Sequence, residues 1–141
     1  MGYVNGLRYR NTEPESSLVK EGNYVPASGQ HAMNTLLSQT PRHGAVFIAS
    51  ELVATRAMLA VKRAGLRILD EVAIVGFDDI PMPEHMDPLL TTVRLPAYGL
   101  GCATGERLVQ LTRGEASDET GILLDSELIV RESATEELMV S

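Results

Sequence analysis

The chain of 141 residues holds a single cysteine, Cys102, and no apolar run long enough to cross a bilayer. One cysteine excludes an internal disulfide and any zinc site built from several cysteines. A membrane-spanning helix needs roughly 18 to 20 consecutive apolar residues. The N-terminal stretch MGYVNGLRYRNTEPE also lacks the apolar core of a secretory signal. We therefore expect a cytoplasmic protein that does not associate with membranes.

Basic residues are also few. The chain has 12 lysines and arginines against 19 acidic residues, which gives a formal net charge of −7. The basic residues form no stripe, whereas proteins that bind nucleic acid cluster them against the phosphates. By itself, the chain is not expected to bind DNA. Its content of 44% apolar and 22% charged residues is typical of a globular domain with one core.

Hydrophobic patterning predicts an alternation of strands and helices along the chain. We expect strands at residues 18–24, 44–50, 71–77, 89–96 and 122–133, and helices at 26–39, 51–64 and 97–113. The apolar stretch GAVFIAS at 44–50 is typical of a fully buried strand. Short connections between alternating elements favour parallel strands with right-handed crossovers. The expected fold class is α/β, with a doubly wound, mostly parallel sheet.

The predicted helix 51–64 has two different faces. One broad apolar face is suited to lie on a sheet, and it consists of Val53, Ala54, Ala57, Met58, Ala60, Val61 and Ala64. Leu52 and Leu59 fall on the opposite side, beside Arg56 and Arg63. These leucines are either isolated surface residues or part of a subunit interface. Ser50 is well placed to cap the start of this helix.

Polar side chains follow three predicted strands at their carboxyl ends. Asp78 and Asp79 follow one strand, Ser50 follows another, and Asn23 and Tyr24 end a third. In open parallel sheets, ligands bind just beyond the carboxyl ends of the strands. The sequence therefore predicts a small-molecule site at this rim.

The adjacent acids Asp78 and Asp79 admit three roles. A metal site would need further carboxylates or histidines, and His31, His43 and His85 have no ligand-like spacing. Neighbouring residues at a strand end also point in opposite directions. The chain lacks the usual nucleophile and phosphate-binding motifs, which leaves a phospho-accepting aspartate as the conceivable catalytic use. We expect neither metal nor cofactor.

The third role is that of a hydrogen-bond acceptor for a ligand. A carboxylate accepts strong charge-assisted bonds from hydroxyl or amino groups, and an aromatic face such as that of Tyr24 stacks on a sugar or base. We assign this role to Asp78 and expect Asp79 to cap the turn after the strand.

Five blocks of the sequence, in order, resemble the lactose-repressor (LacI/GalR) family of bacterial transcription regulators. They are GNYVPASGQHAMNTLL, GAVFIASELVA, the VGFDD motif, the P-x-L-T-T-V-R motif at 88–94, and the closing ILLDSELIVRES. The resemblance covers nearly the whole chain. It implies an N-terminal helix-turn-helix followed by a two-lobed effector domain like that of a type I periplasmic sugar-binding protein.

The resemblance also implies a division of this chain, which looks like a regulator truncated at its N-terminus. Residues 1–94 correspond to the C-terminal lobe of the effector domain. Residues 95–120 correspond to a crossover and a helix that belongs to the missing N-terminal lobe, and 121–141 to a return strand and tail. The implied partners are a sugar or nucleobase-like effector, a second subunit, and operator DNA contacted only through the missing N-terminal region.

By the same resemblance, Asp78, Tyr24 and Ser50 match effector-binding positions. The positions matching the dimer interface are Leu52, Arg56, Leu59, Arg63, Met82 and Met86. The chain departs from the family where Ser50-Glu51 replaces an asparagine-aspartate pair, where Arg56 replaces a glycine, and where Leu95 replaces a glutamine. Two alternatives remain: a lobe of a sugar-binding transport protein, and a receiver-like or hydrolytic enzyme that uses Asp78.

Overall fold

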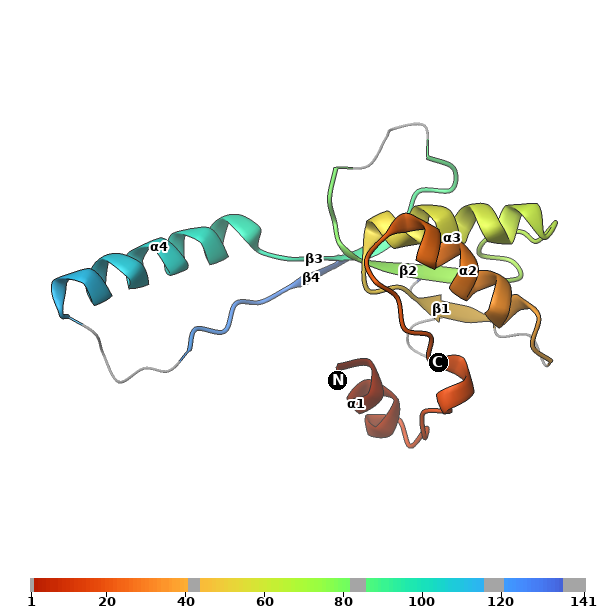
Figure 1. The fold of residues 1–141 in the computed structure, drawn as a ribbon, viewed down its shortest axis with the longest axis horizontal. Helices are drawn as coiled ribbons and strands as arrows, with labels where there is room; N and C mark the ends of the chain where they lie inside the picture. The colour runs from red at the N-terminus through yellow and green to blue at the C-terminus, as the bar shows by residue number, and fades with distance from the viewer. Residues whose placement is uncertain (1, 41–43, 82–85, 116–120, 136–141) are drawn as a thin grey trace.

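The computed structural model describes residues 2–40, 44–81, 86–115 and 121–135. Figure 1 shows a body of helices and strands from which a long helical arm projects. The elements in chain order are α1 (Gly2–Tyr9), the 3-10 turn η1 (Ser16–Leu18), α2 (Pro26–Leu37), β1 (Ala45–Phe47), α3 (Glu51–Arg63), β2 (Ala73–Asp78), β3 (Thr91–Arg94), α4 (Ala97–Arg113) and β4 (Glu127–Ile129).

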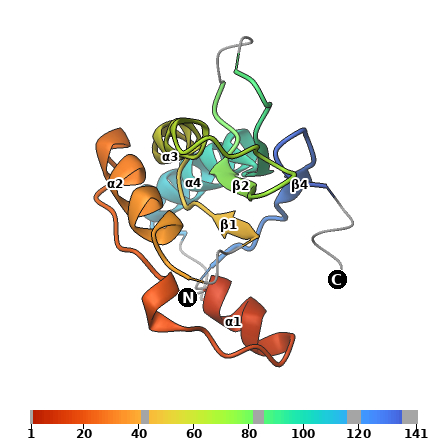
Figure 2. The ribbon, with the colours of Figure 1, turned by 90° about the vertical axis from the view of Figure 1, so that its right-hand side faces the viewer.

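The strands form one sheet in the order β1-β2-β3-β4. The first three strands are parallel and β4 runs antiparallel to β3. Helices α2 and α3 lie on one side of the sheet, and α1 lies on the other side of β1 (Figures 1 and 2). The predicted α/β class with a mostly parallel sheet is therefore confirmed.

The core fills the space between α2, α3 and the sheet. Met33 of α2, Met58 and Val61 of α3 and Ile74 of β2 are all buried there. The inner face predicted for residues 51–64 is confirmed at Ala54, Ala57, Met58, Ala60 and Val61. Gly29 allows the two helices to approach closely, because a Cβ atom at this position would lie 2.2 Å from the carbonyl oxygen of Val53.

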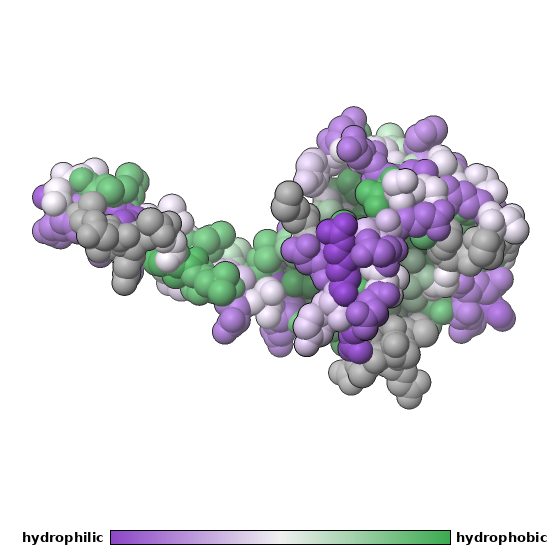
Figure 3. Space-filling view, turned by 90° about the horizontal axis from the view of Figure 1, so that it is seen from below, coloured by the Kyte–Doolittle hydropathy of each residue, from purple (hydrophilic) through white to green (hydrophobic). Residues whose placement is uncertain are grey.

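The arm consists of α4 and the returning segment 121–126, which are joined to the body through β3 and β4 (Figure 1). Helix α4 has the bounds that the sequence predicted, and none of its residues is buried. Leu100, Leu108 and Leu111 are exposed along it. Apolar surface therefore covers much of the arm, shown in green in Figure 3.

One strand prediction was wrong and two were wrong in part. Residues 18–24 form no strand, since Leu18 ends the turn η1 and residues 19–24 are irregular. Residues 44–50 contain only the short edge strand β1, whose Ala45 and Phe47 are exposed rather than buried. Residues 122–133 contain only the short strand β4. A strand forms only where a neighbour accepts and donates its backbone hydrogen bonds. Tertiary structure determines which strands are neighbours, and the hydrophobicity of a short segment gives no information about them.

Candidate functional site

The three predicted effector residues lie at strand or helix boundaries. Asp78 is the last residue of β2, Ser50 immediately precedes α3, and Tyr24 lies two positions before α2. Tyr24 and Asp78 have positive φ angles of 61° and 105°. Left-handed backbone is unfavourable for side chains with a Cβ, and such strain gathers at binding sites.

A cavity of about 360 Å³ contains two of these residues in its lining, Tyr24 and Ser50. Asp78 is not among the lining residues, so the structure brings only two of the three predicted side chains to this cavity. Tyr24 is 72% exposed. Asn23 Oδ1 accepts a hydrogen bond of 3.2 Å from the Val25 backbone, and this Asx turn holds the tyrosine backbone between them.

Asp78 is half-buried, and within the described part of the chain its carboxylate has no hydrogen-bond or ion-pair partner. It lies directly opposite Arg94 in the parallel register of β2 and β3. Arg94, however, bonds to the neighbouring acid. A carboxylate without an internal partner is available to accept hydrogen bonds from a ligand.

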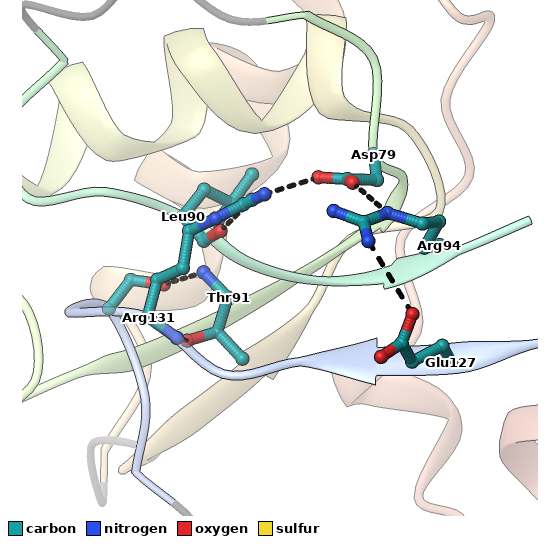
Figure 4. A network of polar contacts seen from close by, with 7 residues as sticks. Asp79, Leu90, Thr91, Arg94, Glu127 and Arg131 are labelled. Atoms are coloured by element: carbon teal, nitrogen blue, oxygen red, sulfur yellow. Dashed lines mark hydrogen bonds and ion pairs between the residues drawn. The ribbon is translucent and has the colours of Figure 1, made fainter.

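Asp79 is the centre of a polar network, shown in Figure 4. Its Oδ2 accepts a hydrogen bond from Arg94 Nε, and its Oδ1 accepts one from Arg131 Nη2, each at 2.6 Å. The Asp79 side chain is only 9% exposed. Burial raises the pKa of this carboxyl, but the hydrogen bonds and positive charges of Arg131 and Arg94 outweigh it and lower the pKa below 3.8. The carboxylate therefore stays ionised, and the hydrogen bond that Arg94 donates to it raises the pKa of Arg94.

The network joins three strands and the segment after β4. Arg131 Nη1 donates to the Leu90 carbonyl at 2.8 Å, and the Arg131 backbone donates to Thr91 Oγ1 at 2.8 Å. Arg94 also forms an ion pair of 3.5 Å with Glu127 of β4. The sequence predicted only a turn cap for Asp79. Its carboxylate instead connects the end of β2 to β3 and to the segment that follows β4, and the two arginines were missed.

The N-terminus of α3 differs from the prediction that the Ser50 side chain caps it. Ser50 occupies the N-cap position and is buried, but its side chain makes no capping hydrogen bond. The next residue, Glu51, is fully buried, and neither of its carboxylate oxygens has a partner among the residues that the structure describes. Sequence reasoning missed this burial. The signal was present, since Glu51 shares a helical face with Ala54, Met58 and Val61.

The residues predicted to form a dimer interface lie mostly on the outer face of α3. Leu52, Arg56 and Arg63 are exposed, and Leu59 is half-buried. Met86 is partly buried and packs against the core, and Met82 lies outside the described residues.

The described ranges contain neither a metal-binding cluster of side chains nor a membrane-spanning helix. No group of three or more histidine, cysteine, aspartate or glutamate side chains there is arranged to hold a metal ion. In the same ranges, every helix is too short or too polar to cross a membrane.

Comparison with known proteins gives consistent results. The model of the periplasmic binding protein-like domain matches residues 2–134. The transcriptional regulator CelR of Thermobifida fusca is 35% identical over 132 residues, which cover 94% of this chain and 39% of that protein. The repressor CytR of Escherichia coli K12 is 33% identical with the same coverage. The chain spans about 40% of the length of the curated relatives that it matches.

Solved structures show the same similarity. The complex of the regulator CelR with cellobiose superimposes with a TM-score of 0.86, at 35% identity, over 94% of this chain and 40% of that one. The lac repressor dimer bound to operator and the anti-inducer ONPF gives a TM-score of 0.84 at 28% identity, over 94% of this chain and 46% of that one.

Proposed function

Because the chain belongs to the family of periplasmic binding protein-like domains, we propose that it is the effector-binding and dimerising region of a LacI-type transcriptional regulator. The relatives confirm the resemblance to LacI-type regulators and favour it over a transport protein. We propose a cytoplasmic, non-enzymatic region that senses a sugar or small metabolite. Operator DNA would be contacted only by a separate N-terminal region of the longer protein.

The proposed domain division follows the shape of the molecule. Residues 1–94 would form one lobe, which contains α1, α2, α3 and the three parallel strands. Residues 95–120 would cross to a second lobe and supply α4 to it, and 121–141 would return to the first lobe. The unburied apolar surface of α4 supports this division, because such a surface is normally covered by another part of the protein.

The observation that carries the effector role is the contrast between Asp78 and Asp79. The Asp79 carboxylate accepts hydrogen bonds from two arginines, whereas the adjacent Asp78 carboxylate has no partner in the described chain. We propose that Asp78 accepts hydrogen bonds from effector hydroxyl or amino groups, while Tyr24 stacks on the effector and Ser50 contributes a hydroxyl.

Effector binding would change the position of the arm relative to the body, and it would involve no chemical reaction. Asp78 lies next to Asp79, whose two arginines are on the outgoing strand β3 and on the segment that follows β4. An effector that binds more tightly at one angle between the lobes would shift the population toward that angle. The change in lobe angle would then alter the dimer and its affinity for DNA.

The test uses the full-length regulator and calorimetric titration. Cellobiose is the first probe, because it is the ligand named in the CelR complex, followed by a panel of sugars and nucleosides. We expect Asp78→Asn to weaken binding of the recognised compound by roughly tenfold to a hundredfold, as for a lost charge-assisted hydrogen bond.

Asp70→Asn is the matched control. Asp70 pairs with Arg67 before β2 begins, at the other end of the strand, and its substitution should leave the affinity unchanged. Equal affinity of the Asp78→Asn protein and the unsubstituted protein would remove Asp78 from the site.

A further inference from the structure

The partner of Arg94 decides whether the Asp78 carboxylate is free. We propose that Asp79 keeps the effector site open by holding the Arg94 side chain away from Asp78. Without the Asp79 carboxylate, Arg94 would pair with Asp78 and exclude the effector. This role of Asp79 rests on the proposed function, in which Asp78 binds the effector. Asp79 itself is a positioning residue, because it acts on the site through Arg94.

Asp78 and Arg94 are direct neighbours across the sheet. They are paired positions in the parallel register of β2 and β3, and adjacent strands lie about 4.8 Å apart. Side chains alternate between the two faces along a strand, so paired positions of parallel neighbours share a face. The Arg94 side chain is longer than this spacing, and rotation about its own bonds is enough to bring its guanidinium to the Asp78 carboxylate. Opposite charges at this distance attract each other.

The backbone at the end of β2 replaces this expected pair by a different one. In a regular strand, Asp79 would point to the face opposite Arg94. Instead, Asp78 and Asp79 have φ angles of 105° and 53°, which are unfavourable for residues with a Cβ atom. The Asp79 carboxylate thereby lies between the guanidinium groups of Arg94 and Arg131 (Figure 4). A costly backbone conformation thus provides Arg94 with a partner other than Asp78.

Burial explains why Arg94 binds Asp79 rather than Asp78. The Asp79 side chain is only 9% exposed, whereas Asp78 is half-buried. Water and salt screen an ion pair less where it is more buried. Arg94 therefore prefers Asp79 while that carboxylate is present, and Asp78 is the next acceptor when it is absent.

The two arginines that bind Asp79 differ in their other contacts. Arg131 Nη1 also donates to a backbone carbonyl at 2.8 Å, and its side chain is 27% exposed. The Arg94 side chain is 49% exposed, and its other contact is an ion pair of 3.5 Å with the exposed Glu127. Exposed pairs of this kind contribute little to stability. Loss of the Asp79 carboxylate would therefore release Arg94 towards Asp78 and leave Arg131 in place.

The first experiment measures the urea midpoint of this chain and uses no effector. Asp78→Asn is introduced into the unsubstituted chain and into the Asp79→Asn chain, each with and without Arg94→Gln. In the unsubstituted chain it should leave the midpoint almost unchanged, because Asp78 has no partner within the described residues. In the Asp79→Asn chain it should lower the midpoint by about 0.3 M, as the loss of a half-exposed ion pair does. Arg94→Gln should abolish this loss.

Arg131→Gln is the matched control for damage to the network. It removes the other hydrogen bond of the Asp79 carboxylate but leaves the bond that holds Arg94. Addition of Asp78→Asn to this variant should cause no further loss. An equal loss in the Asp79→Asn and Arg131→Gln backgrounds, or a loss that persists with Arg94→Gln, would overturn the proposal, because general weakening of the network would then be the cause.

A second variant covers the case in which Asp79→Asn alone does not fold. Asp79→Asn combined with Arg131→Gln replaces this ion pair by two neutral amides, so that Arg131 is not left as an unpaired, partly buried charge. Asp78→Asn should again lower the midpoint of this protein only while Arg94 is present. Absence of that dependence on Arg94 would contradict the proposal.

The second experiment measures effector affinity of the full-length regulator by calorimetric titration, with cellobiose and the panel of sugars and nucleosides as probes. Asp79→Asn should weaken binding about tenfold, and the addition of Arg94→Gln should restore it to within about twofold. Weakening that Arg94→Gln does not relieve would overturn the proposal. The two hypotheses fail separately. Unchanged affinity of the Asp78→Asn regulator removes Asp78 from the site, whereas a missing Arg94-dependent loss in urea overturns only the role of Asp79.

Discussion

Arg131 donates a hydrogen bond of 2.6 Å to Asp79 across 52 positions of sequence. This contact ties the last described segment of the chain to the end of β2, immediately beside the candidate effector residue Asp78. The same carboxylate accepts from Arg94, so one aspartate holds the strand that leaves for the arm and the segment that returns from it. The position of Asp78 relative to the arm therefore depends on its neighbour.

Substitution of Asp79 by asparagine should lower the free energy of unfolding by about 2 kcal/mol at pH 7, the value of hydrogen bonds to a charged group. The amide keeps the shape but loses the charge that attracts both arginines. Urea denaturation measures the loss. Asp70→Asn, which removes an exposed ion pair with Arg67, is the control and should change stability by less than about 1 kcal/mol.

The effect of Asp79 should depend on pH. Its pKa is lowered in the folded state, so the unfolded chain binds the proton more tightly. The stabilisation is therefore fully present above the unfolded pKa of about 3.9 and is lost as pH falls through the folded value. The denaturation curves of the Asp79→Asn protein and the unsubstituted protein should therefore converge in acid. A constant difference between pH 7 and pH 2 would show that the carboxylate charge is not the cause.

Gly29→Ala should destabilise the body by at least about 1–3 kcal/mol, as overpacking of a core does. The added Cβ would lie 2.2 Å from the Val53 carbonyl oxygen. This oxygen belongs to the backbone of α3, so the contact is relieved only if the helix backbone shifts. Gly105→Ala in α4 is the control, because open space surrounds that position. It should stabilise the helix by up to about 1 kcal/mol. Thermal unfolding followed by circular dichroism separates the two outcomes.

Glu51→Gln should leave stability unchanged or raise it by about 1–3 kcal/mol at neutral pH. Glu51 is fully buried and its oxygens have no partner in the described chain, and a neutral amide costs less to bury than an unpaired carboxylate. The free energy of unfolding from urea titration decides this. A clear loss of stability would mean that the carboxylate has a partner in the protein in solution.

The proposed dimer should dissociate when charge is placed on the outer face of α3. Leu59→Glu and Leu52→Glu should each convert a dimer to a monomer in sedimentation equilibrium, because an unpaired carboxylate would be buried at the interface. Tyr9→Glu is the control, since Tyr9 is 87% exposed at the end of α1 and lies outside both the arm and the proposed interface. An unchanged mass for both α3 variants would remove this face from the interface.

The sequence by itself determined the elements that carry a strong local period. The helix predicted at 97–113 has the bounds of α4, and the inner face of α3 follows from the spacing of Ala54, Met58 and Val61. The motif blocks identified the family, because ordered matches along the whole chain carry more information than any single residue. Local spacing also placed Asp78 at the end of β2 and Ser50 directly before α3, whereas the strand that Tyr24 was predicted to end does not form.

Tertiary structure alone decided how those boundaries are used. Asp79 and Asp78 are adjacent and chemically identical, and only the approach of Arg94 and Arg131 from 15 and 52 positions away distinguishes them. The apolar run around β1 reads as a buried strand, yet it lies at a sheet edge beside a cavity. Hydrogen-bond partners and strand neighbours come from distant parts of the chain, so the hydrophobicity of a short segment contains no record of them.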